Sequence, residues 1–285
     1  MPQDPGPMVR RRQLGAALRR YRTSRHLSIK QVAEQLLCSE AKISRIETAQ
    51  RNATLRDVRD LSNMYDLPEA VKTVLMDLAR GSRERGWWQD KNLDAAMETL
   101  IGMEGSADSI SEFECLIIPG LLQTNEYANA ILEVWEPTQQ QKSVDIRIRR
   151  QRIFYESSRP AFNIIMDEAA IRRSVGSTSI MRRQIERLIE AANTVARIQI
   201  IPFSAGAHLG MTNGFTILQF PQIPALAEGA EEQSIQAVVY AETLSGGTYY
   251  DDTPDVERHI AAFADLRTRA LSPEQSINFL RNAVG

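Results

Sequence analysis

The sequence predicts a mainly α N-terminal helix-turn-helix domain of five helices, followed by an α+β C-terminal domain with a mixed sheet. Two observations support this division. Apolar residues recur at helical spacing through the first 80 residues, whereas apolar strand-like runs alternate irregularly with helical segments after Ser106. The length of 285 residues is typical of two domains. We therefore expect one domain over 1–80, a junction over 81–108 and a second domain over 109–285.

The five helices of the first domain are predicted from apolar faces and N-terminal capping residues. The first helix has an apolar face of Leu14, Ala17, Leu18 and Tyr21. Ser28 and Gln31 have the spacing of a capping box and begin the second helix. The remaining helices are expected to begin at Ser39, Thr54 and Pro68.

The segment Ser28–Glu47 has the features of a helix-turn-helix. Ala33 is small enough for two helices to cross there, Leu37–Cys38 supplies a short turn, and Ser39 caps the next helix. Ile43 and Ile46, three residues apart, form the inner face of that helix. Its outer face is short, polar and partly basic (Glu40, Ala41, Lys42, Ser44 and Arg45), which suits the major groove of DNA.

Charge is distributed unevenly along the chain. Residues 1–83 carry 16 Lys and Arg against 9 Asp and Glu, a net of +7, and the remainder carries a net of −9. A basic domain gains affinity for nucleic acid by releasing counterions from phosphates. The distribution therefore favours a nucleic-acid-binding head, although charge alone does not establish one.

The segment Leu14–Leu67 resembles the XRE (Cro/C1-type) helix-turn-helix domain through LGAALRRYR, LSIKQVAEQL and SEAKISRIET. Two positions depart from the family pattern, because Leu37 and Gln50 stand where many relatives have glycine. A non-glycine residue in the turn must accept a left-handed backbone or shift the turn. The resemblance implies binding to double-stranded DNA.

The predicted DNA contacts follow from the outward phase of the second helix of the motif. We expect Ser39, Glu40, Ala41 and Arg45 to face base edges, and Lys30, Lys42 and Arg51 to contact phosphates. One recognition helix reads few base pairs, so we expect a homodimer on a near-palindromic operator.

The second domain is predicted from strands and amphipathic helices. The expected strands are Ser111–Ile118, Phe162–Met166, Ile198–Ile201, Phe215–Phe220 and Ala237–Ala241, with Thr243–Tyr249 as a further candidate. The expected helices are Thr124–Trp135, Gln139–Tyr155, Thr178–Val195 and Asp255–Leu271. Asp167 and Glu168 directly follow a strand, where acidic residues favour a helix N-terminus. The pair Trp87–Trp88 in the junction is expected to pack at a domain or dimer interface, or in the core of the second domain.

Several sequence segments of the second domain resemble another family. FECLIIPGLLQT, MDEAAIRRSVG, IPFSAGAH, VVYAET and FADLRTRALSPEQS are similar to the C-terminal domain of unknown function in WhiJ-like actinobacterial regulators. The resemblance implies a transcriptional regulator, often paired with a small protein encoded next door. An antitoxin-like module, which binds such a protein and autoregulates, is the alternative.

Composition and motifs argue against several other classes. The sequence has no phosphate loop and no GxSxG or HExxH motif, so we expect no enzyme and no cofactor. Cys38 and Cys115 fit neither a disulfide framework nor a metal site. No apolar run is long enough to span a membrane or to act as a secretory leader, so we expect a cytoplasmic protein.

Two groups of residues in the second domain are candidates for an effector or partner. Arg147, Arg149 and Arg150 form a basic cluster on a predicted helix, read either as a solvated face or as a contact for an anion or an acidic protein. His208 follows the loop Ser204–Ala207, read either as a tight turn or as part of a ligand-binding loop. A small-molecule effector remains the second kind of signal that such a domain receives.

Overall fold

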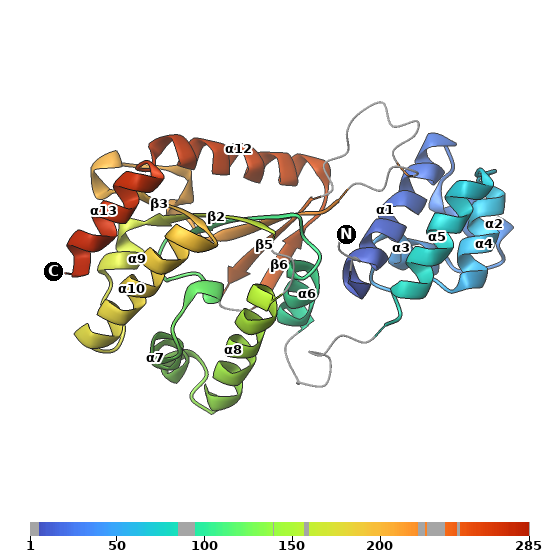
Figure 1. Cartoon of the computed structure of the whole chain (residues 1–285). Helices are drawn as coiled ribbons and strands as arrows, with labels where there is room; N and C mark the ends of the chain where they lie inside the picture. Colours follow the sequence, from blue (N-terminus) through green and yellow to red (C-terminus); the bar gives the residue numbers. More distant parts are fainter. Residues whose placement is uncertain are drawn as a thin grey trace. The chain divides into compact units, whose positions relative to one another are not determined.

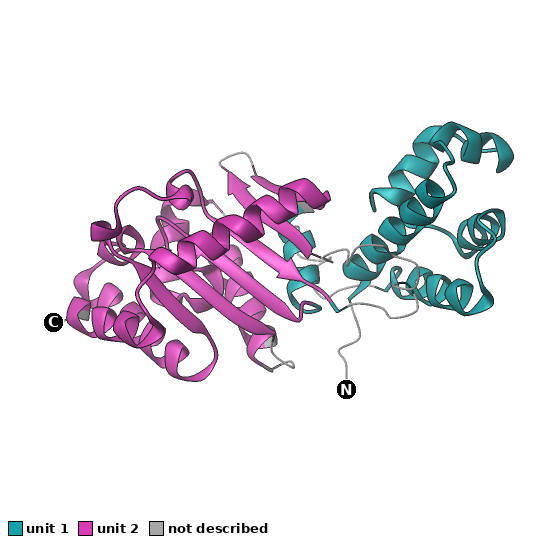
Figure 2. Cartoon of the chain, turned by 90° about the horizontal axis from the view of Figure 1, so that it is seen from above, with its two compact units in different colours: residues 1–106, 221–234 teal, residues 107–220, 235–285 magenta. Residues whose placement is uncertain are grey.

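The computed structural model describes residues 6–84, 95–138, 140–156, 160–221, 226, 237–243 and 246–284 (Figure 1). Residues 1–106 and 221–234 form one compact unit, called unit 1, and residues 107–220 and 235–285 form unit 2 (Figure 2). Trp87–Trp88 and the acidic residues between 228 and 232 lie outside the described residues.

Unit 1 contains the five predicted helices. They are α1 (Pro7–Ser24), α2 (Ile29–Gln35), α3 (Glu40–Glu47), α4 (Leu55–Met64) and α5 (Glu69–Gly81). Their apolar faces meet in one core, which includes Leu18, Val32, Ile43 and Leu75. The capping box at Ser28 is confirmed: the Ser28 Oγ accepts a hydrogen bond from the Gln31 amide at 3.2 Å, and the Gln31 Oε1 accepts one from the Ser28 amide at 2.9 Å. Thr54 forms a capping box with Asp57 at the start of α4, and the Ser39 hydroxyl caps α3 by accepting from the Lys42 amide.

Unit 1 also differs from the prediction in three places. Pro68 is the N-cap of α5 rather than a residue of its first turn. A further helix, α6 (Ala95–Glu104), lies in the segment expected to be a junction and packs against α1. Leu226, from the connection between two strands of unit 2, is 3% exposed and belongs to the core of unit 1.

Unit 2 is built on a six-stranded mixed sheet in the order β3-β2-β1-β4-β5-β6. The strands are β1 (Ser109–Glu114), β2 (Ala161–Asp167), β3 (Arg197–Ile201), β4 (Phe215–Gln219), β5 (Ala237–Thr243) and β6 (Gly246–Tyr250). Strands β1, β2 and β3 are parallel, and β4, β5 and β6 continue the sheet in antiparallel pairs. The predicted α+β class is confirmed.

Helices cover both faces of this sheet (Figure 1). Helix α12 (Thr253–Arg269) buries Val256, Phe263 and Leu266 against side chains such as Phe113 and Val239. The opposite side carries α7 (Asn125–Trp135), α8 (Gln140–Glu156) and α10 (Thr178–Thr194). The short helix α9 (Glu168–Arg172) follows β2, and its N-cap is Asp167, as predicted from the acidic pair.

Helix α13 (Pro273–Val284) was not predicted. Its start carries a signal that sequence reasoning missed, because Ser272 and Gln275 form another capping box: the Ser272 amide donates to the Gln275 side chain at 2.9 Å, and the Gln275 amide donates to the Ser272 hydroxyl at 3.2 Å. This helix packs on the edge strand β3, where the Ile200 amide donates to the Ser276 hydroxyl at 3.0 Å. The sheet edge is thereby covered.

Candidate nucleic-acid interface

The helix-turn-helix is held together by small and branched apolar residues. Ala33 is 2% exposed where α2 meets α3, and Ile43 and Ile46 are each 2% exposed on the inner side of α3. Gly15 of α1 lies so close to α3 that a Cβ added there would be 2.7 Å from the carbonyl oxygens of Ile46 and Glu47. The orientation of α3 in unit 1 is therefore fixed by backbone contact as well as by its apolar face.

The turn between α2 and α3 adopts a left-handed backbone. Leu37 has φ +51°, and the Cys38 amide donates to the Ala33 carbonyl at 2.9 Å. The turn thus keeps its conformation despite the missing glycine. After α3 the left-handed residue is Ala49 (φ +57°), not Gln50, so Gln50 occupies an ordinary backbone conformation.

The outer face of α3 is open to solvent at the residues predicted to read bases. Ser39, Glu40, Ala41 and Arg45 are all exposed. The Ser39 hydroxyl accepts from the Lys42 amide at 3.2 Å, and the Arg45 Nε donates to the Ala41 carbonyl at 3.1 Å. These contacts are local to the helix, so the Arg45 guanidinium is displayed on the face that the prediction assigns to the groove.

The three predicted phosphate contacts are in different situations. Lys30 and Arg51 are exposed. The Lys42 ammonium instead lies 2.5 Å from the Asp57 Oδ1 of α4, and its side chain is 27% exposed. Burial would raise the pKa of the Asp57 carboxyl, but hydrogen bonds from Lys42 and Thr54 outweigh it and lower that pKa. A phosphate contact by Lys42 stays a prediction, and it would have to compete with this ion pair.

A buried ion pair that sequence reasoning missed joins α1 to the end of α3. The Arg22 Nε and Nη2 donate to the two Glu47 carboxylate oxygens at 2.7 and 2.8 Å, and the Arg22 Nη1 donates to the Leu27 carbonyl at 2.7 Å. The hydrogen bond that Arg22 donates to Glu47 raises the pKa of Arg22, so the guanidinium stays charged. The available signal was the spacing of Arg22, which lies four residues after Leu18 on the face of the helix that carries Leu14 and Leu18.

The basic residues predicted to bind an effector or partner are separated by the structure. Arg147 points inward on α8, where its Nη1 donates to the Gln123 Oε1 at 2.6 Å, and burial together with Arg150 lowers its pKa. Arg149 is exposed. With Asn125, Ile148 and Arg152 it lines a hollow of about 730 Å³ between α7 and α8.

His208 lies apart from this basic cluster, in the loop that joins β3 to β4. Its Nε2 is 3.0 Å from the Asp167 Oδ2, and its side chain is only 3% exposed. The ring meets Phe113 edge-on, with centroids 5.9 Å apart. The Nδ1 has no hydrogen-bond partner among the described residues. The contact ties the loop to the carboxyl end of β2.

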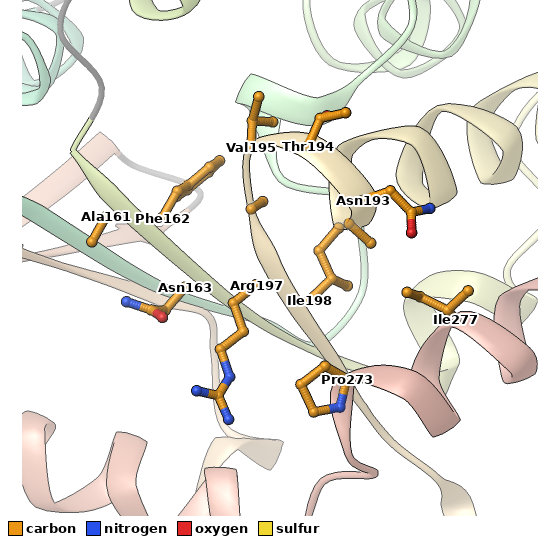
Figure 3. A pocket seen from close by; sticks show the side chains of 12 residues that line it. Ala161, Phe162, Asn163, Asn193, Thr194, Val195, Arg197, Ile198, Pro273 and Ile277 are labelled. Carbon is orange, nitrogen blue, oxygen red and sulfur yellow. The ribbon is translucent and has the colours of Figure 1, made fainter.

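A second hollow, of about 430 Å³, lies at the amino ends of β2 and β3 (Figure 3). Asn163 and Arg197 extend to one side of the strands, and Pro273 and Ile277 of α13 flank them. None of the site residues predicted from the sequence lines this hollow. Within the described parts of the chain, no group of three or more His, Cys, Asp or Glu side chains could hold a metal, and no helix is long and apolar enough to cross a bilayer.

Comparison with known families also divides the chain in two, although the second match begins within α6 of unit 1. Residues 13–75 match a helix-turn-helix domain model, and residues 97–282 match the model of a domain of unknown function, DUF5753. No curated protein and no solved structure matches the chain. The prediction of a helix-turn-helix head followed by an uncharacterised C-terminal domain is confirmed.

Proposed function

Because the chain belongs to the DUF5753 family and carries a helix-turn-helix domain, we propose that it is a sequence-specific transcriptional regulator whose unit 2 dimerises and receives a signal. The observation that carries the proposal is the exposed outer face of α3, on which the Arg45 side chain lies. The opposite face of α3 is held in the core of unit 1 by Ile43, Ile46 and the buried Glu47. A rigid helix with such a face has the form that enters a major groove.

The experiment that tests the DNA-binding role is selection of duplexes from a random pool by the full chain. Arg45→Ala should weaken binding to the selected duplex by roughly 5- to 150-fold and relax one base position, because a bidentate guanidinium contact discriminates by about 1–3 kcal/mol. Arg80→Ala is the matched control, since Arg80 is an exposed arginine on α5 rather than on α2 or α3. Equal losses of DNA affinity in the two variants would show that binding depends on the overall positive charge and not on Arg45 in particular.

Lys30→Ala and Arg51→Ala test the phosphate contacts. Each should weaken all duplexes alike and lower the salt slope of binding by about 1, because one fewer counterion is released. A loss confined to one sequence would instead place these residues at base edges.

The proposed dimer follows from the small number of base pairs that one α3 can read. Two recognition helices about 34 Å apart would double the readout on a near-palindromic operator. Sedimentation of the full chain tests this. A monomer at micromolar concentration that binds a single half-site as tightly as the palindrome would contradict it.

The signal that unit 2 receives is proposed to be a small acidic protein, with a small molecule as the second candidate. The hollow beside Arg149 and Arg152 supports the protein, because its lining carries two guanidinium groups and the apolar Ile148 against the single carboxylate of Asp145. This is a binding role rather than a catalytic one. The antitoxin-like alternative uses the same contact and differs only in that the bound protein would be a toxin.

Calorimetry of the full chain with the product of the neighbouring small gene tests the partner. Arg149→Ala with Arg152→Ala should weaken binding, while Arg182→Ala with Arg183→Ala on α10 should not. The absence of both heat and co-elution would contradict the protein partner. Growth arrest by the small protein alone would favour the antitoxin-like reading.

A further inference from the structure

The turn of the helix-turn-helix carries an exposed leucine. Leu37 is 94% exposed, and the next most exposed large apolar side chain among the described residues is Val134 at 77%. Single exposed apolar residues are common on protein surfaces. Leu37 differs because its backbone is also strained, so two unfavourable features coincide at one residue.

Leu37 shares its left-handed backbone with three other described non-glycine residues, His26, Ala49 and Asp66. Histidine and aspartate tolerate this region, whereas alanine and leucine bear the cost of a Cβ close to the following carbonyl. Ala49 is buried, so Leu37 is the described residue at which this strain coincides with an exposed large apolar side chain. A left-handed leucine lowers the folding equilibrium constant by roughly 5- to 30-fold relative to an unstrained residue. Glycine or asparagine would fit the turn without this penalty.

The side chain of Leu37 faces away from the core of unit 1. Its neighbours Leu36 and Cys38 are both partly buried and pack against that core. One residue beyond Cys38 is Ser39, the N-cap of α3, and the exposed Glu40 and Ala41 follow. The chain from Leu37 to Ala41 spans at most about 14 Å. Because a recognition helix enters the groove by its N-terminal residues, the turn lies at the mouth of the groove.

We propose that Leu37 is a further specificity-determining residue, which packs against a thymine methyl group at the edge of the site read by α3. The inference rests on the proposed DNA-binding function. A thymine presents its methyl group in the major groove and is recognised there by apolar contact. The exposed charged residues nearest to Leu37 in sequence are Glu34 and Glu40, whereas Lys30 and Arg45 lie toward the far ends of α2 and α3. The contact with DNA follows instead from the position of the turn directly before Ser39, Glu40 and Ala41, the residues assigned to base edges.

The test compares Leu37→Asn and Leu37→Gly with the wild-type full chain. Both variants should keep or raise the melting temperature, because glycine lacks the Cβ that causes the left-handed strain and asparagine tolerates that backbone conformation. Both should bind the duplex selected by the wild type about 5- to 30-fold more weakly. In a fresh selection they should lose the preference for thymine at one position beside the bases assigned to Ala41. Val134→Ala, which shortens an exposed apolar side chain of unit 2, should change neither affinity nor preference.

The outcomes separate this inference from the proposed function. Unchanged affinity and preference in both Leu37 variants, with both lost in Arg45→Ala, would overturn the inference and leave the function standing. A wild-type chain that enriches no duplex would overturn both. A Leu37 variant that sediments as a monomer, and that regains full DNA affinity at high protein concentration, would assign Leu37 to a protein interface and contradict the DNA contact.

Discussion

The buried pair Arg22–Glu47 leads to a prediction about the stability of unit 1. The two side chains are 11% and 4% exposed and share two hydrogen bonds, at 2.7 and 2.8 Å. Glu47→Ala would leave the Arg22 guanidinium buried without its counter-ion. We expect this variant to destabilise unit 1 strongly, because an uncompensated buried charge is far more costly than a lost surface contact.

The expected magnitude is about 3–5 kcal/mol for removal of one partner of a buried ion pair. A unit of about 120 residues is stable by only about 6–18 kcal/mol. The variant should therefore lose from about a sixth to most of the stability of unit 1. The double variant Arg22→Met with Glu47→Leu should recover most of it, since well-packed apolar residues replace such pairs at little cost.

Hydrogen exchange of the α1 and α3 amides is the suitable assay, because a chain of two units does not have one defined unfolding free energy. Glu34→Ala, which removes an exposed acid from α2, is the matched control and should change protection little. A loss below about 1 kcal/mol in Glu47→Ala would refute the reasoning. So would a double variant as unstable as the single one.

Three further predictions follow from unit 1. Asp57→Asn should destabilise unit 1 at pH 7, and the difference from the wild type should fade as the pH falls below 3.8. The pKa of Asp57 is lowered in the folded state, so its contribution is present above the ordinary pKa and is lost on acidification; thermal melts across this range measure it. Leu226→Ala should cost roughly 2–5 kcal/mol and reduce the hydrogen-exchange protection of α1, because the side chain is buried in the core of unit 1. Gly15→Ala should weaken DNA binding more than Ala16→Ser does, because only the Cβ at Gly15 meets the backbone of α3; an unchanged operator affinity would contradict this.

The sequence was enough to locate the start of nearly every predicted helix, because the hydrogen bonds of a helix cap are local. Ser28, Ser39, Thr54 and Thr124 each accept a hydrogen bond from the amide three residues later. Such a contact depends on the backbone of four residues and on no distant part of the chain. Helical periodicity likewise identified Ile43 and Ile46 as buried, and so identified the outer face of α3.

Helical periodicity did not predict which residues the polar or outward-facing side chains contact. Lys42 has the phase of an exposed residue, yet it reaches Asp57 of the next helix. Arg147 belongs to a basic run, yet it turns inward to Gln123. A long side chain explores several ångströms around its Cα, so its partner depends on which helix packs beside it.

The sequence by itself determined the two-part organisation, the order of most helices and strands, and the exposed outer face of α3, because these follow from local hydrogen bonding and from the spacing of apolar residues. Only the tertiary structure decided the pairing of Arg22 with Glu47, of Asp167 with His208, and the burial of Leu226 beside α1. These partners lie 25, 41 and about 200 residues apart in the chain. Nothing local joins them, so their contacts appear only when whole elements pack.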